Sequence, residues 1–347
     1  MKKTVMEKSN LNSRREFLQK LLALSAVAGF YPYLDTVAEM GASKMKKGKL
    51  PLRPLGRTGQ MVGIYSLGGQ AAIETIGKEE LSVQIINRAI DLGINYIDTA
   101  AWYGRPTATI TQEEAHGHSE KNMGQVMKYR RKEVFLATKT HDRTYDGSMK
   151  LLEKSLKNLQ TDHLDLWQIH NVKAEQLDKL DKFFASDGVV KAMEKMRDEK
   201  VVRFIGFTGH ENPEVLKVLA ERYPFDNVLV ALNAADKHFD PFIEKFLPTA
   251  VANKMGIVGM KIPARDRIFD HGGIITIKEA MEYVMSLPVS TIIIGLDDVA
   301  QLEENIIIAR DFKPLTPDQM LEIEEKTKPY YKELQFFKNL SEWPAEW

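Results

Sequence analysis

The chain has 347 residues, of which 44% are hydrophobic and 28% charged, a composition that excludes disordered, collagen-like and polytopic membrane proteins. Lys and Arg number 48 and Asp and Glu also 48, so no net positive field favours nucleic acid or anionic lipid as a partner. The absence of cysteine excludes disulfides, thiolate catalysis, and zinc or iron–sulfur sites with cysteine ligands.

The first 45 residues have the pattern of an export signal. A basic stretch ending at Arg14 and Arg15 precedes a charge-free run from Leu21 to Leu34. This run is shorter than the about 20 apolar residues of a spanning helix, so no stable membrane anchor is expected. The segment Ser13–Leu18 resembles a twin-arginine signal. We therefore expect residues 1–45 to be a signal peptide and short linker that the twin-arginine export machinery recognises, and the mature protein to be periplasmic. An amphipathic surface helix is the alternative.

Residues 46–347 are expected to form one domain, because no linker or low-complexity segment interrupts the chain from Leu50 onward. Eight short β-branched segments predict strands at Met61–Leu67, Asn95–Asp98, Val134–Thr138, Leu164–Ile169, Phe204–Thr208, Val228–Leu232, Ile257–Met260 and Thr291–Ile294. Helical spacing between them is clearest at Glu79–Asp91, Ser148–Leu159, Val189–Lys200 and Pro213–Glu221. Eight strands separated mostly by helices predict a parallel sheet closed into a (β/α)8 TIM barrel, an α/β fold.

An open doubly wound sheet is the competing architecture. It should carry a glycine-rich dinucleotide turn after its first strand, and no G-x-G-x-x-G occurs in the chain. The sequence therefore favours the barrel. From about residue 314 an extension follows, helical at Pro317–Lys328 and then rich in aromatic residues. We expect it to cover barrel surface, with a lid or a dimer contact as alternatives, and no oligomeric state is predicted.

Polar residues stand at the ends of three successive predicted strands. Asp98 ends the second strand and Tyr103 follows it, while Lys139 and His170 end the next two. Alone, each has an ordinary explanation as a solvated or packed side chain. Because the carboxyl ends of barrel strands open into one mouth, we expect the four side chains to converge there.

Together these four side chains suit carbonyl reduction. Tyr103 holds its proton at neutral pH, and a cation at Lys139 favours release of that proton. Asp98 can keep Lys139 charged, and His170 can hydrogen-bond the reacting oxygen. This set places a proton donor at a developing alkoxide, and the hydride must come from a cofactor because no side chain carries one. The sequence has no nucleophile elbow, H-E-x-x-H motif or Walker loop.

At these residues the chain resembles the aldo/keto reductase family, from about Pro54 to Asn305. The matching stretches are Leu55–Gly59, Ile97–Gly104, Ala137–Lys139, Ser155–Leu159, Asp165–His170 and Ile205–His210. The resemblance implies a (β/α)8 barrel that interconverts a carbonyl of an aldehyde, ketone or sugar and an alcohol with NAD(P)(H). It also implies that Asp98, Tyr103, Lys139 and His170 are the catalytic residues, with Tyr103 as general acid/base.

The resemblance further implies where the cofactor would lie. Thr208 and Asn233 are expected near the nicotinamide carboxamide, and Lys261 in a loop that passes the cofactor. The adenine end is expected at Gly295, Asp297, Gln301, Glu304 and Asn305. No metal site is predicted.

Two acidic residues in the predicted cofactor site depart from the family pattern. Where many relatives carry basic residues for the 2′-phosphate of NADP, this chain has Asp297 and Asp298. Carboxylates repel a phosphate but accept a hydrogen bond from a ribose hydroxyl, so the sequence favours NAD over NADP. Arg265 and Arg267 are the alternative source of positive charge.

Two further departures concern the nicotinamide ring and the loop after Tyr103. At Asn233 and Met260 many relatives carry Gln and an aromatic residue. The loop is longer than the usual pattern and carries Arg105, Glu113, Glu114, His116 and His118. We expect it to be solvated or to contact substrate, and a metal site is the alternative.

An export signal on a nicotinamide enzyme predicts a cofactor that is loaded before export and stays tightly bound, because free nicotinamide nucleotides belong to the cytoplasm. Such an enzyme needs a second substrate or an external partner to reset it, or catalyses a redox-neutral change. The alternative function is a catalytically quiet barrel that binds a nucleotide or a sugar as a sensor or accessory subunit.

Overall fold

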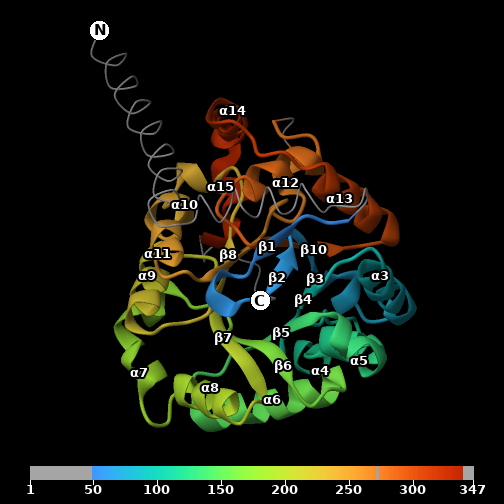
Figure 1. The fold of residues 1–347 in the computed structure, drawn as a ribbon, viewed down its shortest axis with the longest axis vertical. Helices are drawn as coiled ribbons and strands as arrows, with labels where there is room; N and C mark the ends of the chain where they lie inside the picture. Colours follow the sequence, from blue (N-terminus) through green and yellow to red (C-terminus); the bar gives the residue numbers. More distant parts are fainter. Residues whose placement is uncertain (1–48, 271–272, 339–347) are drawn as a thin grey trace.

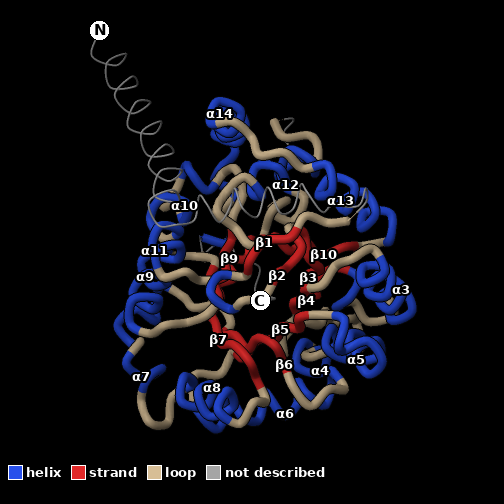
Figure 2. The backbone as a smooth tube through the Cα atoms, in the orientation of Figure 1, coloured by secondary structure: helices blue, strands red, loops and turns tan. Residues whose placement is uncertain are grey.

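The structure, a computed structural model, describes residues 49–270 and 273–338, and the predicted signal segment lies outside them. Within this part of the chain, eight parallel strands close into a barrel in which β10 pairs with β3. The strands are β3 Tyr65–Ala71, β4 Tyr96–Asp98, β5 Phe135–Thr140, β6 Leu164–Ile169, β7 Val202–Gly209, β8 Asn227–Ala231, β9 Gly256–Met260 and β10 Thr291–Leu296. Figure 2 shows the ring of strands with helices outside it, which confirms the predicted TIM barrel.

The helices that follow the strands begin at local capping signals. Thr144 caps α6 and Asn212 caps α9, where Pro213 occupies the first helical position. The helices are α3 Glu79–Asp91, α4 Gln112–Ala115, α5 His118–Arg130, α6 Tyr145–Leu159, α7 Asp181–Phe184, α8 Val189–Asp198, α9 Pro213–Arg222, α10 Phe242–Lys245, α11 Leu247–Ala252, α12 Ile277–Met285, α13 Val299–Asp311, α14 Pro317–Thr327 and α15 Tyr331–Leu334. No helix among the described residues is long and apolar enough to cross a membrane.

The first predicted strand is wrong in its boundaries. Met61–Leu67 is divided: β2, Met61–Gly63, pairs antiparallel with β1, Leu52–Pro54, and the barrel strand β3 begins at Tyr65. The apolar run continues through the break because residues 62–69 are all buried, so its pattern does not reveal the turn between the two strands.

The hairpin of β1 and β2 closes the amino-terminal end of the barrel (Figure 1). It is held by residues that come just before barrel strands. The Gly63 amide donates to the Asn95 side chain, before β4, at 2.9 Å, and the Arg57 amide donates to the Lys254 carbonyl, before β9, at 2.8 Å. Buried side chains from the hairpin and the strands fill the interior: Leu55, Val62, Tyr96, Phe135, Ala137, Leu166, Leu229, Val258, Met260 and Ile293. The carboxyl-terminal end is therefore the end left to receive a ligand.

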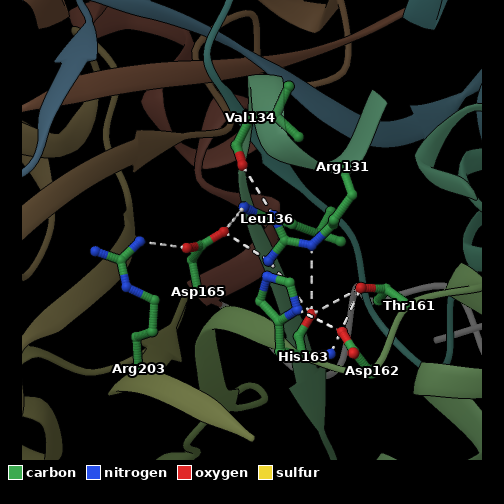
Figure 3. A network of polar contacts seen from close by, with 8 residues as sticks. All are labelled: Arg131, Val134, Leu136, Thr161, Asp162, His163, Asp165 and Arg203. Atoms are coloured by element: carbon green, nitrogen blue, oxygen red, sulfur yellow. Dashed lines mark hydrogen bonds and ion pairs between the residues drawn. The ribbon is translucent and has the colours of Figure 1, made fainter. Parts of the chain in front are cut away.

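A buried acid also ties strands together at the closed end (Figure 3). Asp165 accepts hydrogen bonds from Arg131 at 2.7 Å, Arg203 at 2.6 Å and the Leu136 amide at 2.8 Å. These contacts link the starts of β5, β6 and β7. Because Asp165 has all its partners within the chain, this network is structural.

The carboxyl-terminal extension packs along the barrel and then reaches its open end. In α14, Glu324 accepts a 2.7 Å hydrogen bond from Tyr283 of α12. Beyond α15, Lys338 donates to Asp236 at 2.5 Å, in the loop after β8. The extension thus brings residues near 335–338 to the loops that surround the predicted active site.

Candidate active site

A buried ion pair forms the base of the site. Lys139, in β5, donates to a carboxylate oxygen of Asp98, at the end of β4, and at 2.6 Å to the Thr99 carbonyl. Gln168, in β6, donates to the other Asp98 oxygen at 2.9 Å. Asp98 is fully buried and Lys139 is 1% exposed. Buried charges persist only when paired and hydrogen-bonded, and here each is.

Tyr103 and His170 stand above this pair, nearer to solvent. The Lys139 amine donates to the Tyr103 hydroxyl at 3.4 Å and lies 4.7 Å from the ring centroid. The His170 ring meets the Tyr103 ring edge-on, with centroids 5.7 Å apart. Both side chains are partly exposed. The structure therefore brings together all four residues predicted to be catalytic, with two charges below and two titratable rings toward the opening.

Burial determines the protonation of these rings. Burial raises the Tyr103 pKa well above its usual value, and the negative charges of Asp98 and Glu74 raise it further. Burial, and then the charge of Lys139, holds the His170 pKa well below its usual value. That Lys139 favours release of the phenol proton stays a prediction. The ammonium is engaged with Asp98 and Thr99, and desolvation of a phenolate dominates.

Gln168 and Arg143 are site residues that sequence reasoning missed. Gln168 shares the inward face of β6 with His170, two residues away, and this period-two spacing was a signal for it. The Arg143 guanidinium donates to the His170 carbonyl at 2.7 Å and to the His141 carbonyl at 3.0 Å. Its role depends on the folded loops, and nothing in the sequence pattern indicated it.

Trp102, His116 and His141 form an aromatic wall next to the four residues. The His141 ring stacks on the Trp102 indole with centroids 3.8 Å apart. The centroid of the His116 ring lies 5.4 Å from that of Trp102 and 6.5 Å from that of His141. His116 and His141 are therefore not on opposite faces of the indole. Trp102 remains 40% exposed. Burial lowers the His141 pKa to about 4 and also lowers the His116 pKa, so the wall is uncharged at neutral pH.

The long loop after Tyr103 does not gather its charged residues. Arg105 pairs with Glu74 at 3.0 Å, Glu114 closes a capping box with Thr111, and His118 contacts Glu79 at 3.0 Å. Among residues 49–270 and 273–338, no three His, Asp or Glu side chains lie close enough to hold a metal ion. The loop instead contributes His116 to the aromatic wall.

Thr208 and Asn233, predicted near the nicotinamide, are buried and hold loops in place. Thr208 Oγ1 accepts a 2.7 Å bond from the Asn171 amide. Asn233 Oδ1 accepts from the Ala235 amide at 3.0 Å and from Gln335 Nε2 at 2.7 Å, while its Nδ2 donates to the Lys261 carbonyl at 3.3 Å. Burial, aided by Arg265, lowers the Lys261 pKa to about 7.

Gln335 is a further residue that the sequence did not indicate. Its side chain is buried, and its Oε1 has no hydrogen-bond partner in the part of the chain that the structure describes. An unpaired buried acceptor beside Asn233 fits a ligand that brings an N–H donor, such as a carboxamide. The residues present therefore fit a nicotinamide at this end of the barrel.

The residues predicted for the adenine end lie at the end of β10 and along α13: Gly295, Asp297, Gln301, Glu304 and Asn305. Asp298 caps α13 by accepting from the Gln301 amide at 2.8 Å, and the Gln301 side chain accepts from the Asp297 amide at 2.9 Å. Asn305 is buried and donates to the Tyr65 hydroxyl at 3.2 Å, while Glu304 is exposed. The first two contacts shape the turn after β10, and the Asn305 side chain contacts the first residue of the barrel strand β3.

Residues 61–265, more than half of the chain, match the Aldo/keto reductase family. The chain is 25% identical over 330 residues to an uncharacterized oxidoreductase of Bacillus subtilis, YqkF, covering 82% of this chain and 97% of the relative. It is 25% identical over 339 residues to the L-galactose dehydrogenase of Arabidopsis thaliana, covering 86% and 98%. An aldo-keto reductase of Klebsiella pneumoniae solved with NADPH shares the fold, with a TM-score of 0.64 and 20% identity over 82% of this chain and 96% of that one.

Proposed function

Because this chain belongs to the aldo/keto reductase family, we propose that it interconverts a carbonyl and an alcohol by NAD(P)-dependent hydride transfer, with Tyr103 as the general acid/base. The observation that carries the proposal is the hydrogen bond from Lys139 to the Tyr103 hydroxyl, at 3.4 Å, above the buried ion pair with Asp98.

A bound nicotinamide nucleotide supplies or accepts the hydride that no side chain can carry. The residues of this chain handle the proton. Tyr103 remains protonated in the resting site and donates to the carbonyl oxygen as that oxygen gains charge; in the reverse direction it takes the proton back. Neutral His170 hydrogen-bonds the same oxygen. Lys139, held by Asp98, stabilises the phenolate that forms.

The replacement Tyr103→Phe tests this assignment. We expect turnover to fall by about 10²- to 10⁴-fold, because the proton donor is lost while the ring remains. The dissociation constant for the nucleotide should change little. Turnover is measured by the absorbance of the reduced nicotinamide. The matched control is Tyr129→Phe, since Tyr129 is 79% exposed on α5. Full turnover in Tyr103→Phe would contradict the mechanism, and a wild-type protein that binds nucleotide or sugar without turnover would favour the quiet barrel.

A sugar or similar polyhydroxylated carbonyl is the substrate class we infer. The uncharged aromatic wall supports it, because the open part of Trp102 suits the C–H face of a sugar ring. The name of one relative, L-galactose dehydrogenase, points the same way.

NAD is the cofactor we favour, for an electrostatic reason. Burial raises the Asp266 pKa, and the negative charges of Asp297 and Asp270 raise it further, so carboxylates lie near one another beside the turn after β10. A 2′-phosphate would be repelled there. Arg265 and Arg267 are the alternative source of positive charge, and the Arg267 guanidinium lies 4.2 Å from the Phe336 ring centroid. The Klebsiella relative was solved with NADPH, and tighter binding of NADP than of NAD here would refute the preference.

Export to the periplasm is a further part of the proposal and rests on the Arg14–Arg15 signal alone. The cofactor would then be loaded in the cytoplasm and stay bound after export. Cell fractionation of the full chain tests this, and its retention in the cytoplasm would contradict it.

A further inference from the structure

We propose that Gln335, from the carboxyl-terminal extension, is a cofactor-binding residue whose side-chain carbonyl accepts a hydrogen bond from the nicotinamide carboxamide. The inference rests on the proposed function, since it requires a nicotinamide nucleotide in the barrel mouth. No motif of the family resemblance includes this residue, which lies beyond all of them.

The extension is anchored beside the active site by contacts on both sides of Gln335. Lys338 donates to Asp236 at 2.5 Å and to the Phe239 carbonyl at 2.8 Å, both in the segment after β8. The Arg267 guanidinium, from the segment after β9, lies over the Phe336 ring. Figure 1 shows this last part of the chain, in red, beside α10 and α12. Residue 335 is therefore held at the end of the barrel where β8 and β9 finish.

A third contact connects the extension with the end of β7. The Phe337 ring meets the His210 ring edge-on, with centroids 6.5 Å apart, and His210 directly follows β7. Burial lowers the His210 pKa well below its usual value, and the charges of Lys261 and then Lys139 lower it further. The extension is therefore held against the strand end that follows β6 in the barrel.

Hydrogen bonding fixes which atom of Gln335 is offered to a ligand. The side chain is 2% exposed, and its Nε2 donates to Asn233 Oδ1 at 2.7 Å. Rotating the amide by half a turn would set two oxygen atoms against each other, so this bond holds the orientation. Oε1 is then a positioned, buried acceptor without a donor among residues 49–270 and 273–338. Buried acceptors are rarely left unpaired in native proteins.

Asn233 itself has little capacity left for a carboxamide N–H. Its Oδ1 already accepts two hydrogen bonds, from Ala235 and Gln335, and Thr208 Oγ1 accepts one from Asn171. A carboxamide presents two N–H donors as well as an oxygen, and the donors require an acceptor. Gln335 Oε1 supplies that acceptor.

The test compares three nucleotides on the mature protein by isothermal titration calorimetry. NAD⁺ carries the carboxamide, 3-acetylpyridine adenine dinucleotide has a methyl group in place of its NH₂, and ADP-ribose lacks the ring altogether. We expect wild type to bind NAD⁺ about tenfold more tightly than the acetylpyridine analogue. Gln335→Leu should lose this discrimination and bind ADP-ribose as wild type does.

Two controls separate binding from folding. Lys332→Gln, at an exposed position on α15, should keep the discrimination, and the thermal midpoint of every variant is measured. If Gln335→Leu does not fold, Gln335→Met, which keeps the length of the side chain and removes its carbonyl, takes its place in the comparison.

The outcomes are distinct. Equal wild-type affinity for NAD⁺ and the analogue overturns the inference, as does a Gln335→Leu variant that still discriminates or that loses ADP-ribose binding in parallel. Failure of wild type to bind NAD(H) or NADP(H) at all overturns the proposed function instead.

Discussion

At the scale of single residues, the site buries the ion pair of Asp98 and Lys139 and keeps its two rings neutral. Asp98 and Lys139 compensate each other, so the reacting oxygen faces a phenol and an imidazole and not an ion. A neutral donor can transfer a proton to a developing alkoxide without first giving up strong solvation. The pKa directions of Tyr103 and His170 leave both rings neutral at neutral pH, the state that the proposed mechanism requires.

Removal of the indole at Trp102 should alter substrate choice more than chemistry. For Trp102→Ala we expect the KM for sugars to rise about tenfold, because the loss of apolar contact in a pocket costs about 1–3 kcal/mol. The KM for a short aliphatic aldehyde should change much less. Steady-state kinetics on both substrates measure the difference, and Trp102→Phe serves as the control that keeps a ring. A similar rise for both substrates would argue against the sugar platform.

Lys261 should make cofactor affinity depend on pH. Its pKa, lowered by burial to about 7, means that it loses its positive charge as the pH rises through neutrality. An anionic pyrophosphate favours the protonated form, so affinity should fall as pH rises above 7, by at most about tenfold per pH unit. Dissociation constants from pH 6 to 9 measure this. Lys261→Met should flatten the profile, and an unchanged profile would show that another group is responsible.

At the scale of elements, the long loop after β4 clamps the turn that carries the catalytic phenol. Gln112 of α4 donates to the Gly104 carbonyl at 2.9 Å, and the Ser119 amide of α5 donates to the Tyr103 carbonyl at 3.2 Å. A Cβ atom at position 104 would lie 1.8 Å from the Ala115 carbonyl oxygen. Only glycine permits this approach, so the loop and the turn are positioned together.

The variant Gly104→Ala should therefore reduce catalysis as well as stability. The loop or the turn must move to admit the methyl group, and a displacement of about 1 Å at a catalytic group can cost about 10²-fold in rate. We expect kcat to fall by that order and the thermal midpoint to drop. Gly59→Ala is the control: its φ of +73° is strained for alanine, but no atom lies within 4 Å of the added methyl group. It should lower stability alone, and an unchanged kcat in Gly104→Ala would reject the clamp.

At the scale of the whole molecule, the two ends of the barrel are built differently. The amino-terminal end is closed by the β1–β2 hairpin and tied by Asp165. The carboxyl-terminal end gathers the residues proposed to be catalytic, the aromatic wall and the extension. The contacts that tie the strands together and the residues of the proposed active site thus lie at opposite ends of the barrel.

The buried pair of Lys338 and Asp236 should hold the extension in place. Both side chains are almost completely buried, with exposed fractions of 0% and 1%. Lys338→Met would leave a buried, unpaired carboxylate, which typically costs about 3–5 kcal/mol. We expect the extension to become protease-sensitive and nucleotide affinity to fall with it. The double variant Asp236→Asn, Lys338→Met should recover part of the lost stability. Unchanged proteolysis in the single variant would mean that other contacts anchor the extension.

The sequence by itself determined the barrel and the predicted catalytic set. Strand and helix periods are local properties, and strand ends of a closed parallel barrel meet at one mouth whatever their separation along the chain, so Asp98, Lys139 and His170 could be grouped without coordinates. Only the tertiary structure decided the break before Tyr65, the lowered pKa of His170, the wall around Trp102 and the position of Gln335. These depend on burial and on contacts between segments far apart in the chain, such as Asn233 and Gln335, which are 102 residues apart, and no local pattern records such contacts.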